Sequence, residues 1–405
     1  VPYLRLVPSD GGVRITQSRA TPFGVEQPAQ LWKVPLTLTY SDGREVRTTS
    51  VLLDRESALV ALPGCPHPAW VMPDGGGVGY FAWRAPEDML VRIAHEARTA
   101  LSPAERVAFV GNLDLLLRMG EVHGDGYLAA LGGFGDDPEP QVVNAVMEQL
   151  GSVRGAFVPD SLEPLFRRYV RHTLGPTLDR VGLERRPGED EVVSTMRPQL
   201  VQWLALQGHD EKVLAWARDA AKRWLADPAS VDPAMADVVL LLAARDGDAA
   251  LYDTFRTRFE QATVPAERRR YLSAMGGFAD TTLERRTLEY VLGDKVVASE
   301  TMTPFMGMAT RGERASLRLW DWMTSHYDQL VAHIPPPAVR FLPMMGGGGC
   351  SEERLARVRE FFLQPEHAMP GIEKLVERNA ERTHDCLSMR AREGRAVEAY
   401  FRSLP

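Results

Sequence analysis

Two hydrophobic periods follow one another along the chain. Over about the first 85 residues, apolar and polar side chains alternate in short segments, a pattern typical of β-strands. The clearest such segments are residues 13–17, 32–40, 45–49 and 79–83. A polar turn at residues 41–44, Ser-Asp-Gly-Arg, separates two of them as a hairpin would. The pattern predicts a small β-sandwich domain over residues 1–85.

Beyond Pro86 the apolar residues recur at helical spacing. Ser102, Pro103 and Glu105 form a capping-box pattern that starts a helix running to Gly120. Further helical patterns cover residues 127–131, 141–150, 162–174, 196–225, 233–244, 249–261, 266–276, 281–292, 315–332, 352–362 and 371–401. The sequence therefore predicts a mostly α protein in which the sandwich is followed, over residues 86–405, by a large α-helical solenoid of HEAT/armadillo-like hairpins.

The helical pair at residues 196–225 is the clearest of these hairpins. Two apolar stripes at helical spacing are separated by a short break at Gly208, His209 and Asp210. A single hairpin of this kind cannot bury both of its apolar sides, so it needs neighbouring hairpins on either side. The tryptophans on these stripes, such as Trp203 and Trp216, are expected to pack in the core.

Composition narrows the possible partners. The 405 residues carry a formal net charge of -7, which argues against nucleic-acid binding because such proteins usually present a basic face. No apolar run approaches the roughly 18 residues of a membrane span, so no membrane partner is expected. The chain starts with Val1 and lacks the pattern of a secretory signal, which indicates processing or excision from a longer protein.

The cysteine content gives a mild expectation about the compartment. Cys65, Cys350 and Cys386 are widely separated and odd in number, which implies no disulfide framework. A reducing compartment is expected, so the cytoplasm is the predicted location and the periplasm is the alternative.

A search for catalytic motifs leaves no complete constellation. His95 and Glu96 begin a zinc-peptidase-like helix, but Thr99 stands where the second histidine ligand would be needed. His384 and Cys386 could form a base and thiol pair, although a solvated polar helix is the simpler interpretation. The glycine runs at residues 75–79 and 346–349 lack the flanking residues of phosphate-binding or dinucleotide-binding motifs and are expected to be loops.

Several short motifs, in the right order, resemble the C-terminal half of the M1 family of zinc aminopeptidases, the gluzincins related to aminopeptidase N and the oxytocinase-type enzymes. In the sandwich they are residues 13–17 ending in Gln17, the Trp-x-x-Pro segment from Trp32, then Trp70, Asp74 and Gly79-Tyr80-Phe81, with Asp74 in place of the family's asparagine. In the helical part they are residues 101–106, the pair at 196–225, residues 319–322 with Tyr327, and residues 355–362.

This resemblance implies a role but no activity for the chain by itself. In that family the zinc site and the exopeptidase motif lie in a thermolysin-like domain, and this sequence has neither HExxH nor the Gly-x-Met-Glu-Asn loop. The resemblance therefore implies no cofactor in this chain and zinc in a catalytic domain of the same polypeptide. The implied partners are that domain and the peptide substrates, whose N-terminal amino acids the whole enzyme would release.

The resemblance also suggests one substrate-binding residue, Arg311. It lies nine positions before Trp320, where oxytocinase-type members place an arginine that faces the internal cavity near the peptide's C-terminal end. A guanidinium there could hold a carboxylate through two hydrogen bonds; the alternative is an exposed arginine at a helix start. The family's Tyr-Lys pair in that cavity falls on Phe157 and Val158, so one cation is missing.

A second function remains open on the same pattern. A solenoid groove also suits a free-standing scaffold or peptide-binding module without enzymatic activity.

Overall fold

The computed structural model describes residues 1–309, 311–346, 349–367 and 369–404. The strands are β1 (Pro2–Ser9), β2 (Gly12–Arg19), β3 (Val34–Ser41), β4 (Val46–Leu53), β5 (Ser57–Ala61), β6 (Trp70–Met72) and β7 (Ala82–Arg84). The α-helices are α1 (Glu87–Ala100), α2 (Pro103–Met119), α3 (Gly124–Phe134), α4 (Pro140–Phe157), α5 (Glu163–Val181), α6 (Glu191–Gln202), α7 (Glu211–Ala226), α8 (Ala236–Arg245), α9 (Ala249–Gln261), α10 (Pro265–Met275), α11 (Thr281–Tyr290), α12 (Thr303–Ala309), α13 (Glu313–Ser325), α14 (Tyr327–His333), α15 (Pro336–Val339), α16 (Leu342–Gly346), α17 (Glu352–Phe362) and α18 (Ile372–Ser403). The predicted fold class, small β-sheets followed by many helices, is confirmed.

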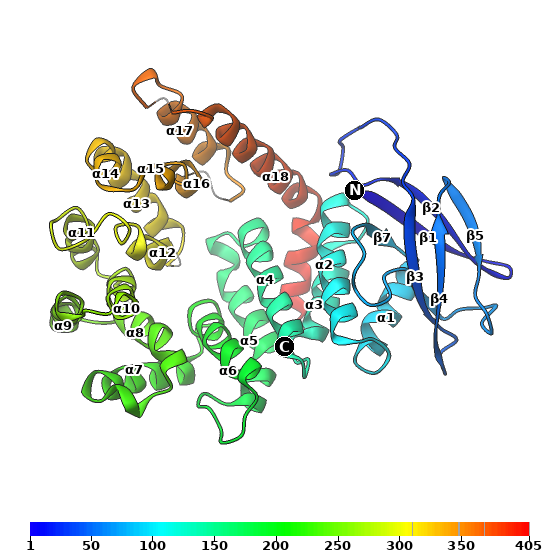
Figure 1. Cartoon of the computed structure of the whole chain (residues 1–405), viewed down its shortest axis with the longest axis horizontal. Helices are drawn as coiled ribbons and strands as arrows, with labels where there is room; N and C mark the ends of the chain where they lie inside the picture. The colour runs from blue at the N-terminus through cyan, green and yellow to red at the C-terminus, as the bar shows by residue number, and fades with distance from the viewer. Residues whose placement is uncertain (310, 347–348, 368, 405) are drawn as a thin grey trace. The chain divides into compact units, whose positions relative to one another are not determined.

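Two sheets make up the β-sandwich (Figure 1). One has the strand order β5-β2-β1-β7 and the other the order β4-β3-β6. Strand β1 pairs antiparallel with β2 and parallel with β7. Alternate apolar residues of both sheets are buried, among them Leu4, Leu6, Ile15, Leu36 and Leu38. The alternation seen in the sequence is therefore the inward-facing register of the strands.

The predicted strand at residues 79–83 begins later than expected. Strand β7 starts at Ala82, and Gly79 belongs to a loop whose amide hydrogen-bonds to the Asp74 carboxylate at 2.7 Å. A Cβ added at Gly79 would come within 2.5 Å of the Phe81 ring. The loop is therefore held at Gly79 by the Asp74 side chain and at Gly75 by the Thr37 carbonyl of β3.

The hairpin predicted at residues 196–225 is present and contains a wide turn. Helix α6 runs into a π-helical segment (Trp203–Gln207), in which the Gly208 amide donates to the Trp203 carbonyl. His209 has a φ of 49°, in the left-handed region, and the Asp210 carboxylate caps α7 by accepting from the Lys212 and Val213 amides.

The chain divides into two compact units. The first comprises Val1–Thr177 with Asp385–Pro405, and the second comprises Leu178–His384. In the second unit, successive helices pack on one another from α7 through α8, α10, α12, α13 and α16 to α17 (Figure 1). The division expected after residue 85, where strands give way to helices, stays a prediction.

In the first unit, the end of α18 is held by backbone acceptors far away in sequence. Arg390 donates to the Ala156 carbonyl and Arg392 to the Leu117 carbonyl. The buried Glu393 carboxylate accepts from the Gly124 amide at 3.0 Å. Charged side chains thus help to fix the last helix against α2, α3 and α4, in addition to its fully buried Val397 and Phe401.

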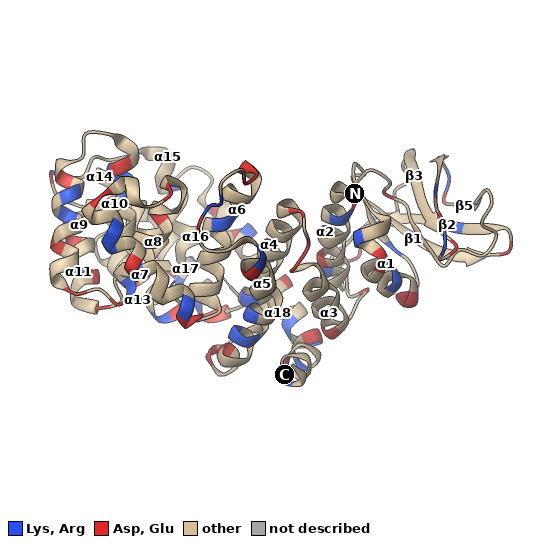
Figure 2. Ribbon diagram, turned by 90° about the horizontal axis from the view of Figure 1, so that it is seen from below, with Lys and Arg blue, Asp and Glu red and all other residues tan. Residues whose placement is uncertain are grey.

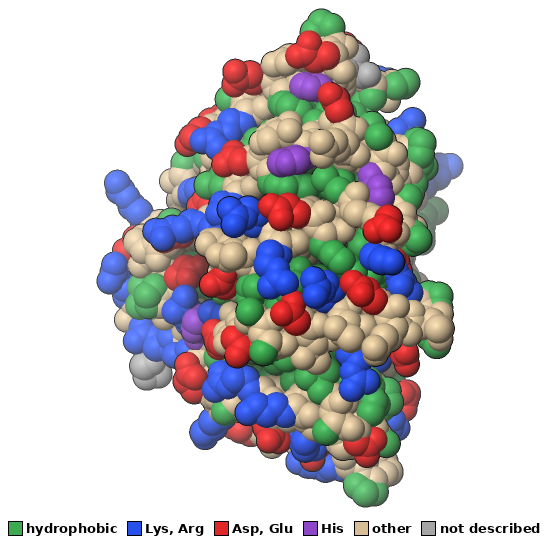
Figure 3. Space-filling view, turned by 90° about the vertical axis from the view of Figure 1, so that its left-hand side faces the viewer, with side chains coloured by type: hydrophobic (Ala, Val, Ile, Leu, Met, Phe, Trp, Pro, Cys, Tyr) green, Lys and Arg blue, Asp and Glu red, His purple; other side chains and the backbone are tan. Residues whose placement is uncertain are grey.

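The surface carries charges of both signs. Basic and acidic residues are interspersed along the helices (Figure 2), and the face formed by helices of the second unit shows the same mixture (Figure 3). None of the described helices is long and apolar enough to cross a lipid bilayer.

One buried carboxylate joins the sandwich to the first long helices. Glu105 Oε1 accepts from Thr39 Oγ1 at 3.0 Å and from the Gly76 amide at 3.1 Å, while Oε2 accepts from the Ser102 amide at 2.8 Å. Ser102 in turn accepts from the Glu105 amide, so the predicted capping box is confirmed. Strand β3, the glycine loop and the start of α2 therefore meet at Glu105.

The Glu105 contacts predict a pH-dependent contribution to stability. Burial raises the pKa of the Glu105 carboxyl, but its hydrogen bonds to Ser102 and Gly76 outweigh burial and leave the pKa below 4.5. The contribution of ionised Glu105 to stability is therefore complete above pH 4.5. It is lost as the pH falls through the lower pKa that Glu105 has in the folded state. Glu105→Gln should reduce the free energy of unfolding at pH 7 by about 1–3 kcal/mol, measured by urea denaturation. Glu45→Gln, at an exposed position, is the control; equal stabilities of the two variants would contradict this role.

Candidate functional site

The predicted residue Arg311 follows α12 and is largely shielded from solvent. Its side chain is 9% exposed, so the alternative of an exposed arginine at a helix start is wrong. One terminal nitrogen donates to the Phe278 carbonyl, and the other donates to Glu284 Oε2. Arg311 is thus anchored to the segment that leads into α11.

A second arginine binds the same carboxylate. Arg318 of α13 donates two hydrogen bonds of 2.8 Å to Glu284, one from Nε to Oε1 and one from a terminal nitrogen to Oε2. This is the two-pronged geometry in which a guanidinium and a carboxylate bind most strongly. Glu284 is 5% exposed, whereas the Arg318 side chain is 41% exposed. We call these three residues the Arg311 cluster.

The Arg311 cluster contains one more positive than negative charge. Burial lowers the pKa of Arg311, although Glu284 opposes the shift. Burial also raises the pKa of Glu284, but the hydrogen bond from Arg318 and the charge of Arg311 outweigh it, so the Glu284 pKa is lowered. The cluster is therefore ionised at neutral pH. Among the described residues, the buried Nε of Arg311 has no hydrogen-bond partner.

The cluster has the chemistry to hold a carboxylate, and Glu284 already supplies one. A second carboxylate would have to use the Arg311 Nε or the exposed part of Arg318. The positions that correspond to the family's Tyr-Lys pair add no cation: Phe157 is buried at the end of α4, and Val158 follows it as the helix cap.

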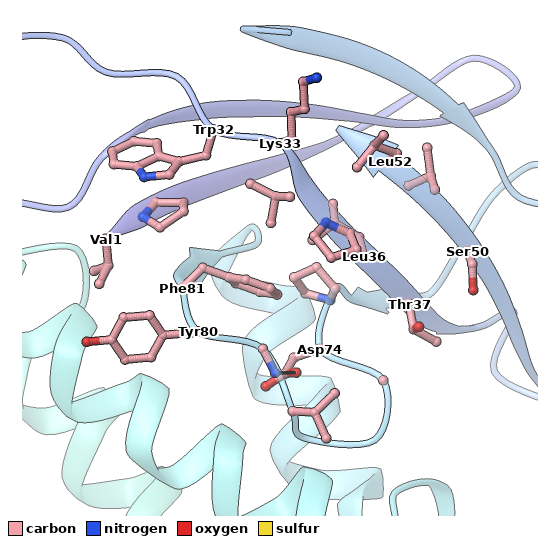
Figure 4. Close-up of a pocket in the computed structure, with 18 of the residues that line it drawn as sticks. Val1, Trp32, Lys33, Leu36, Thr37, Ser50, Leu52, Asp74, Tyr80 and Phe81 are labelled. Carbon is pink, nitrogen blue, oxygen red and sulfur yellow. Dashed lines mark hydrogen bonds between the residues drawn. The ribbon is translucent and has the colours of Figure 1, made fainter. Parts of the chain in front are cut away.

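A separate cleft of about 990 Å³ opens in the β-sandwich (Figure 4). Its walls are the first half of β3, the end of β4 and the loop that leads to β7. The side chains that form it are mainly apolar and include Trp32, Leu36, Leu52, Tyr80 and Phe81. Lys33 and Asp74 are its charged members.

Asp74 occupies the position where the resembled family has asparagine, and its hydrogen bonding is now clear. The side chain is 8% exposed, and Oδ1 accepts from the Gly79 amide at 2.7 Å. An asparagine oxygen could accept the same bond. Burial raises the pKa of the Asp74 carboxyl, and the charge of Glu105 adds to that shift.

The zinc-peptidase-like stretch in α1 has a structural role. Glu96 Oε2 accepts from the Trp70 indole nitrogen at 2.7 Å, and His95 is exposed. Across the described ranges, no three or more histidine, cysteine, aspartate or glutamate side chains converge as a metal site would require. The resemblance places the zinc site in the catalytic domain and not in this chain, and that stays a prediction.

The possible thiol nucleophile is not available. Cys386 is disulfide-bonded, so both that alternative and the expected absence of disulfides are wrong. The Nε2 atom of His384 lies 3.2 Å from Oε1 of the exposed Glu352. The glycine run at 75–79 forms the loop beside Glu105, whereas residues 347 and 348 of the second run lie outside the described residues.

Comparison with known proteins decides the family. The family model described as "ERAP1-like C-terminal domain" matches residues 70–385, which is most of the chain. The chain belongs to the ERAP1-like C-terminal domain family of M1 aminopeptidases. The resemblance inferred from the sequence motifs is thereby confirmed.

Individual relatives of this ERAP1-like chain are distant. It is 21% identical to aminopeptidase 2 of Candida albicans over 88% of its own length and 39% of that protein. It is 22% identical to the alanine/arginine aminopeptidase of Saccharomyces cerevisiae over 85% of its length and 40% of that protein. Aminopeptidase M1-A of Oryza sativa shares 21% identity over 81% of the chain and 38% of the relative. The chain thus spans about two fifths of these proteins.

The ERAP1-like chain contains two site residues that the sequence did not suggest, Glu284 and Arg318. Glu284 precedes Arg285 and Arg286 in α11. Arg286 does pair with Asp253 at 2.8 Å on a partly exposed surface, but Glu284 points to the opposite, buried side. The helical period around Leu283 and Leu288, both buried, is the signal that could have shown it.

Removing the Glu284 charge should destabilise this ERAP1-like chain. In Glu284→Gln, the buried Arg311 loses its only carboxylate partner among the described residues. We expect the free energy of unfolding to fall by about 3 kcal/mol, which is the lower end of the cost of breaking a buried ion pair. The lower end applies because solvent screens the charge of the partly exposed Arg318. Urea denaturation would measure it. Glu289→Gln on the same helix, 65% exposed, should change little; a similar loss in both would contradict the assignment.

Restoring the family's asparagine should stabilise the chain at neutral pH. In the folded chain the pKa of the Asp74 carboxyl is raised above 3.8. Ionisation of Asp74 therefore lowers the free energy of unfolding as the pH rises from 3.8 through the pKa of the folded state. Asp74→Asn keeps the acceptor for Gly79 without the charge. Its free energy of unfolding at pH 7 should rise by on the order of 1 kcal/mol, with no charge-related gain at pH 3. Thermal unfolding at both pH values tests this, and a less stable variant at pH 7 would refute it.

Proposed function

We propose that this chain is the non-catalytic C-terminal region of an M1 zinc aminopeptidase, where it closes over the catalytic domain and forms part of the peptide-binding cavity. The observation that carries the proposal is the family match over residues 70–385. The similarity to named aminopeptidases over more than four fifths of the chain supports it. The whole enzyme would release N-terminal amino acids from peptides.

The chemistry of hydrolysis belongs to the catalytic domain in this proposal. When bound there, zinc would supply a polarised water as the nucleophile. The role of this chain in the proposal is to bind the peptide and to exclude bulk water. Enclosure of this kind also limits which substrates can reach the reacting groups.

Arg311 is the proposed contact for the far end of the peptide. Its guanidinium is held in place by Phe278 and Glu284, and Arg318 brings a second, more exposed cation to the same carboxylate. A peptide carboxylate would be attracted by the excess positive charge of the Arg311 cluster. Because Phe157 and Val158 replace a tyrosine and lysine, we expect weaker recognition of the peptide's C-terminus than in members that have that pair.

The second candidate is a binding module without enzymatic activity. The observation that favours it is the uninterrupted packing of successive helices in the second unit, which suits partner binding as well as closure of a peptidase.

Activity and metal content separate the two proposals. The isolated 405-residue chain should release no fluorophore from aminoacyl substrates, even with added zinc. The native polypeptide, detected with an antibody against this chain, should have at least twice the 45.0 kDa mass of the chain and contain zinc. A native 45 kDa species without zinc would favour the binding module. Chelator-sensitive activity of the isolated chain would falsify the non-catalytic role.

A further inference from the structure

We propose that a small cavity in the second unit binds an alkylammonium group, that is, an aliphatic chain that ends in a protonated amine. The cavity has a volume of about 160 Å³. Three segments form its walls: the chain that follows α5, the outer side of α7 at Trp216, and the loop that precedes α8. The inference goes beyond the proposed function and does not depend on it, because every wall belongs to this chain.

The inner part of the cavity is apolar. Val231 is 8% exposed and Met235 is 2% exposed, and the half-buried Trp216 lines the cavity with them. A volume of 160 Å³ holds about five groups the size of a water molecule, at roughly 30 Å³ each, which is the heavy-atom count of a butylammonium ion. Tryptophan is also the aromatic side chain that attracts cations most strongly. The cavity therefore suits one short aliphatic chain with a cationic end.

Two carboxylates that line the cavity each have an oxygen to spare. Glu184 Oε1 accepts from the Trp216 indole nitrogen at 3.4 Å and from Arg223 at 2.9 Å, whereas Oε2 has no donor among the described residues. Asp232 Oδ1 accepts from the Ala234 amide at 2.9 Å, and Oδ2 likewise has no donor within the described ranges. An ammonium group brings three N–H donors and a positive charge, so it is attracted to both side chains.

The charges around the cavity favour a cation. Arg185 also lines it, but its guanidinium pairs at 2.7 Å with a carboxylate outside the lining. Arg223 pairs with Glu184 at 2.9 Å and with Asp219 at 3.1 Å. Together with Asp232, these groups comprise four carboxylates and two guanidinium groups. The negative charges are therefore in excess, and a bound cation would balance part of that excess.

The segment that carries Glu184 is held in place by a buried arginine. The Arg197 side chain of α6 is 0% exposed. Its Nε donates to the Gly182 carbonyl at 2.9 Å, and a terminal nitrogen donates to the Val181 carbonyl at 3.2 Å. Gly182 has a φ of 72°, in the left-handed region that favours glycine. This wall of the cavity is thus fixed before a ligand binds, which reduces the entropy lost on binding.

Other classes of ligand fit the cavity less well. An anion would meet the excess of carboxylates. A neutral apolar group would fill the inner part, but it would remove water from the charged groups without replacing their hydrogen bonds. A metal ion such as Ca²⁺ takes roughly six to eight oxygen ligands, whereas Glu184 and Asp232 are the only carboxylates of the lining.

Titration of the 405-residue chain with butylammonium chloride tests the inference. Binding is followed by the proton–nitrogen NMR signal of the Trp216 indole, which is assigned by its loss in Trp216→Phe. We expect a saturable shift of this signal, because the aliphatic chain lies against the indole. Butan-1-ol, which has the same length but no charge, should bind at least about tenfold more weakly. No saturable shift, or equal binding of the alcohol, would overturn the proposal.

Two variants test the carboxylates separately. Asp232→Asn keeps the acceptor for the Ala234 amide, and Glu184→Gln changes a side chain that is 64% exposed, so both should fold, as checked by thermal unfolding. Each should weaken butylammonium binding by about tenfold, because a hydrogen bond to a charged group is lost. Glu211→Gln, an exposed position in the first turn of α7 outside the lining, is the matched control. Wild-type affinity in both cavity variants, or an equal loss in the control, would contradict the assignment.

Two further probes distinguish the sources of an alkylammonium group. N-acetyl-lysine methylamide represents a lysine side chain of a peptide, and putrescine represents a free polyamine. Tighter binding of the first assigns the cavity to lysine side chains, and tighter binding of the second assigns it to polyamines. If neither displaces butylammonium, the cavity is not a site for either natural amine and the proposal fails. These results are independent of zinc and of the mass of the native polypeptide, so they stand or fall apart from the proposed function.

Discussion

The carboxylate of Glu105 is the contact on which the N-terminal part of this molecule depends. It accepts hydrogen bonds from a strand, a loop and a helix start, and no cation is among these donors. Neutral donors with fixed positions make such a site selective for one geometry, because each bond is short-ranged and directional. The glycine loop beside β3, and with it the wall of the sandwich cleft, takes its shape from this arrangement.

Local patterns predicted the elements whose signals lie within one helix or turn. Ser102 and Glu105 are three residues apart and marked the start of α2, and the two stripes flanking Gly208 marked α6 and α7 correctly. Strand β1 was not predicted, although it is as long as β2; it lies between β2 and β7 in its sheet. Helix α1 was not among the predicted helices. His95 and Glu96 were considered only as part of a metal motif, whereas in the structure Glu96 accepts a hydrogen bond from the Trp70 indole.

The candidate site was only partly accessible from sequence, for a related reason. Family resemblance pointed to Arg311, but its partner Glu284 lies 27 residues earlier and Arg318 reaches the same carboxylate from another helix. No local spacing encodes a contact between α11, α13 and the turn that carries Arg311. A buried charge in a helix is visible only when the apolar period is followed far enough to show which side faces inward.

The wide turn that ends α6 has an evolutionary consequence. Its carbonyl at Trp203 is reached by the amide five residues later, at Gly208, so the turn accommodates one residue more than a regular α-helix. Each residue of an α-helix rotates the chain by about 100°. Homologues that lack the extra residue would keep both helices of the hairpin yet need a gap at this point in an alignment. Without that gap, each residue of α7 would be aligned one position out of register, about 100° away around the helix.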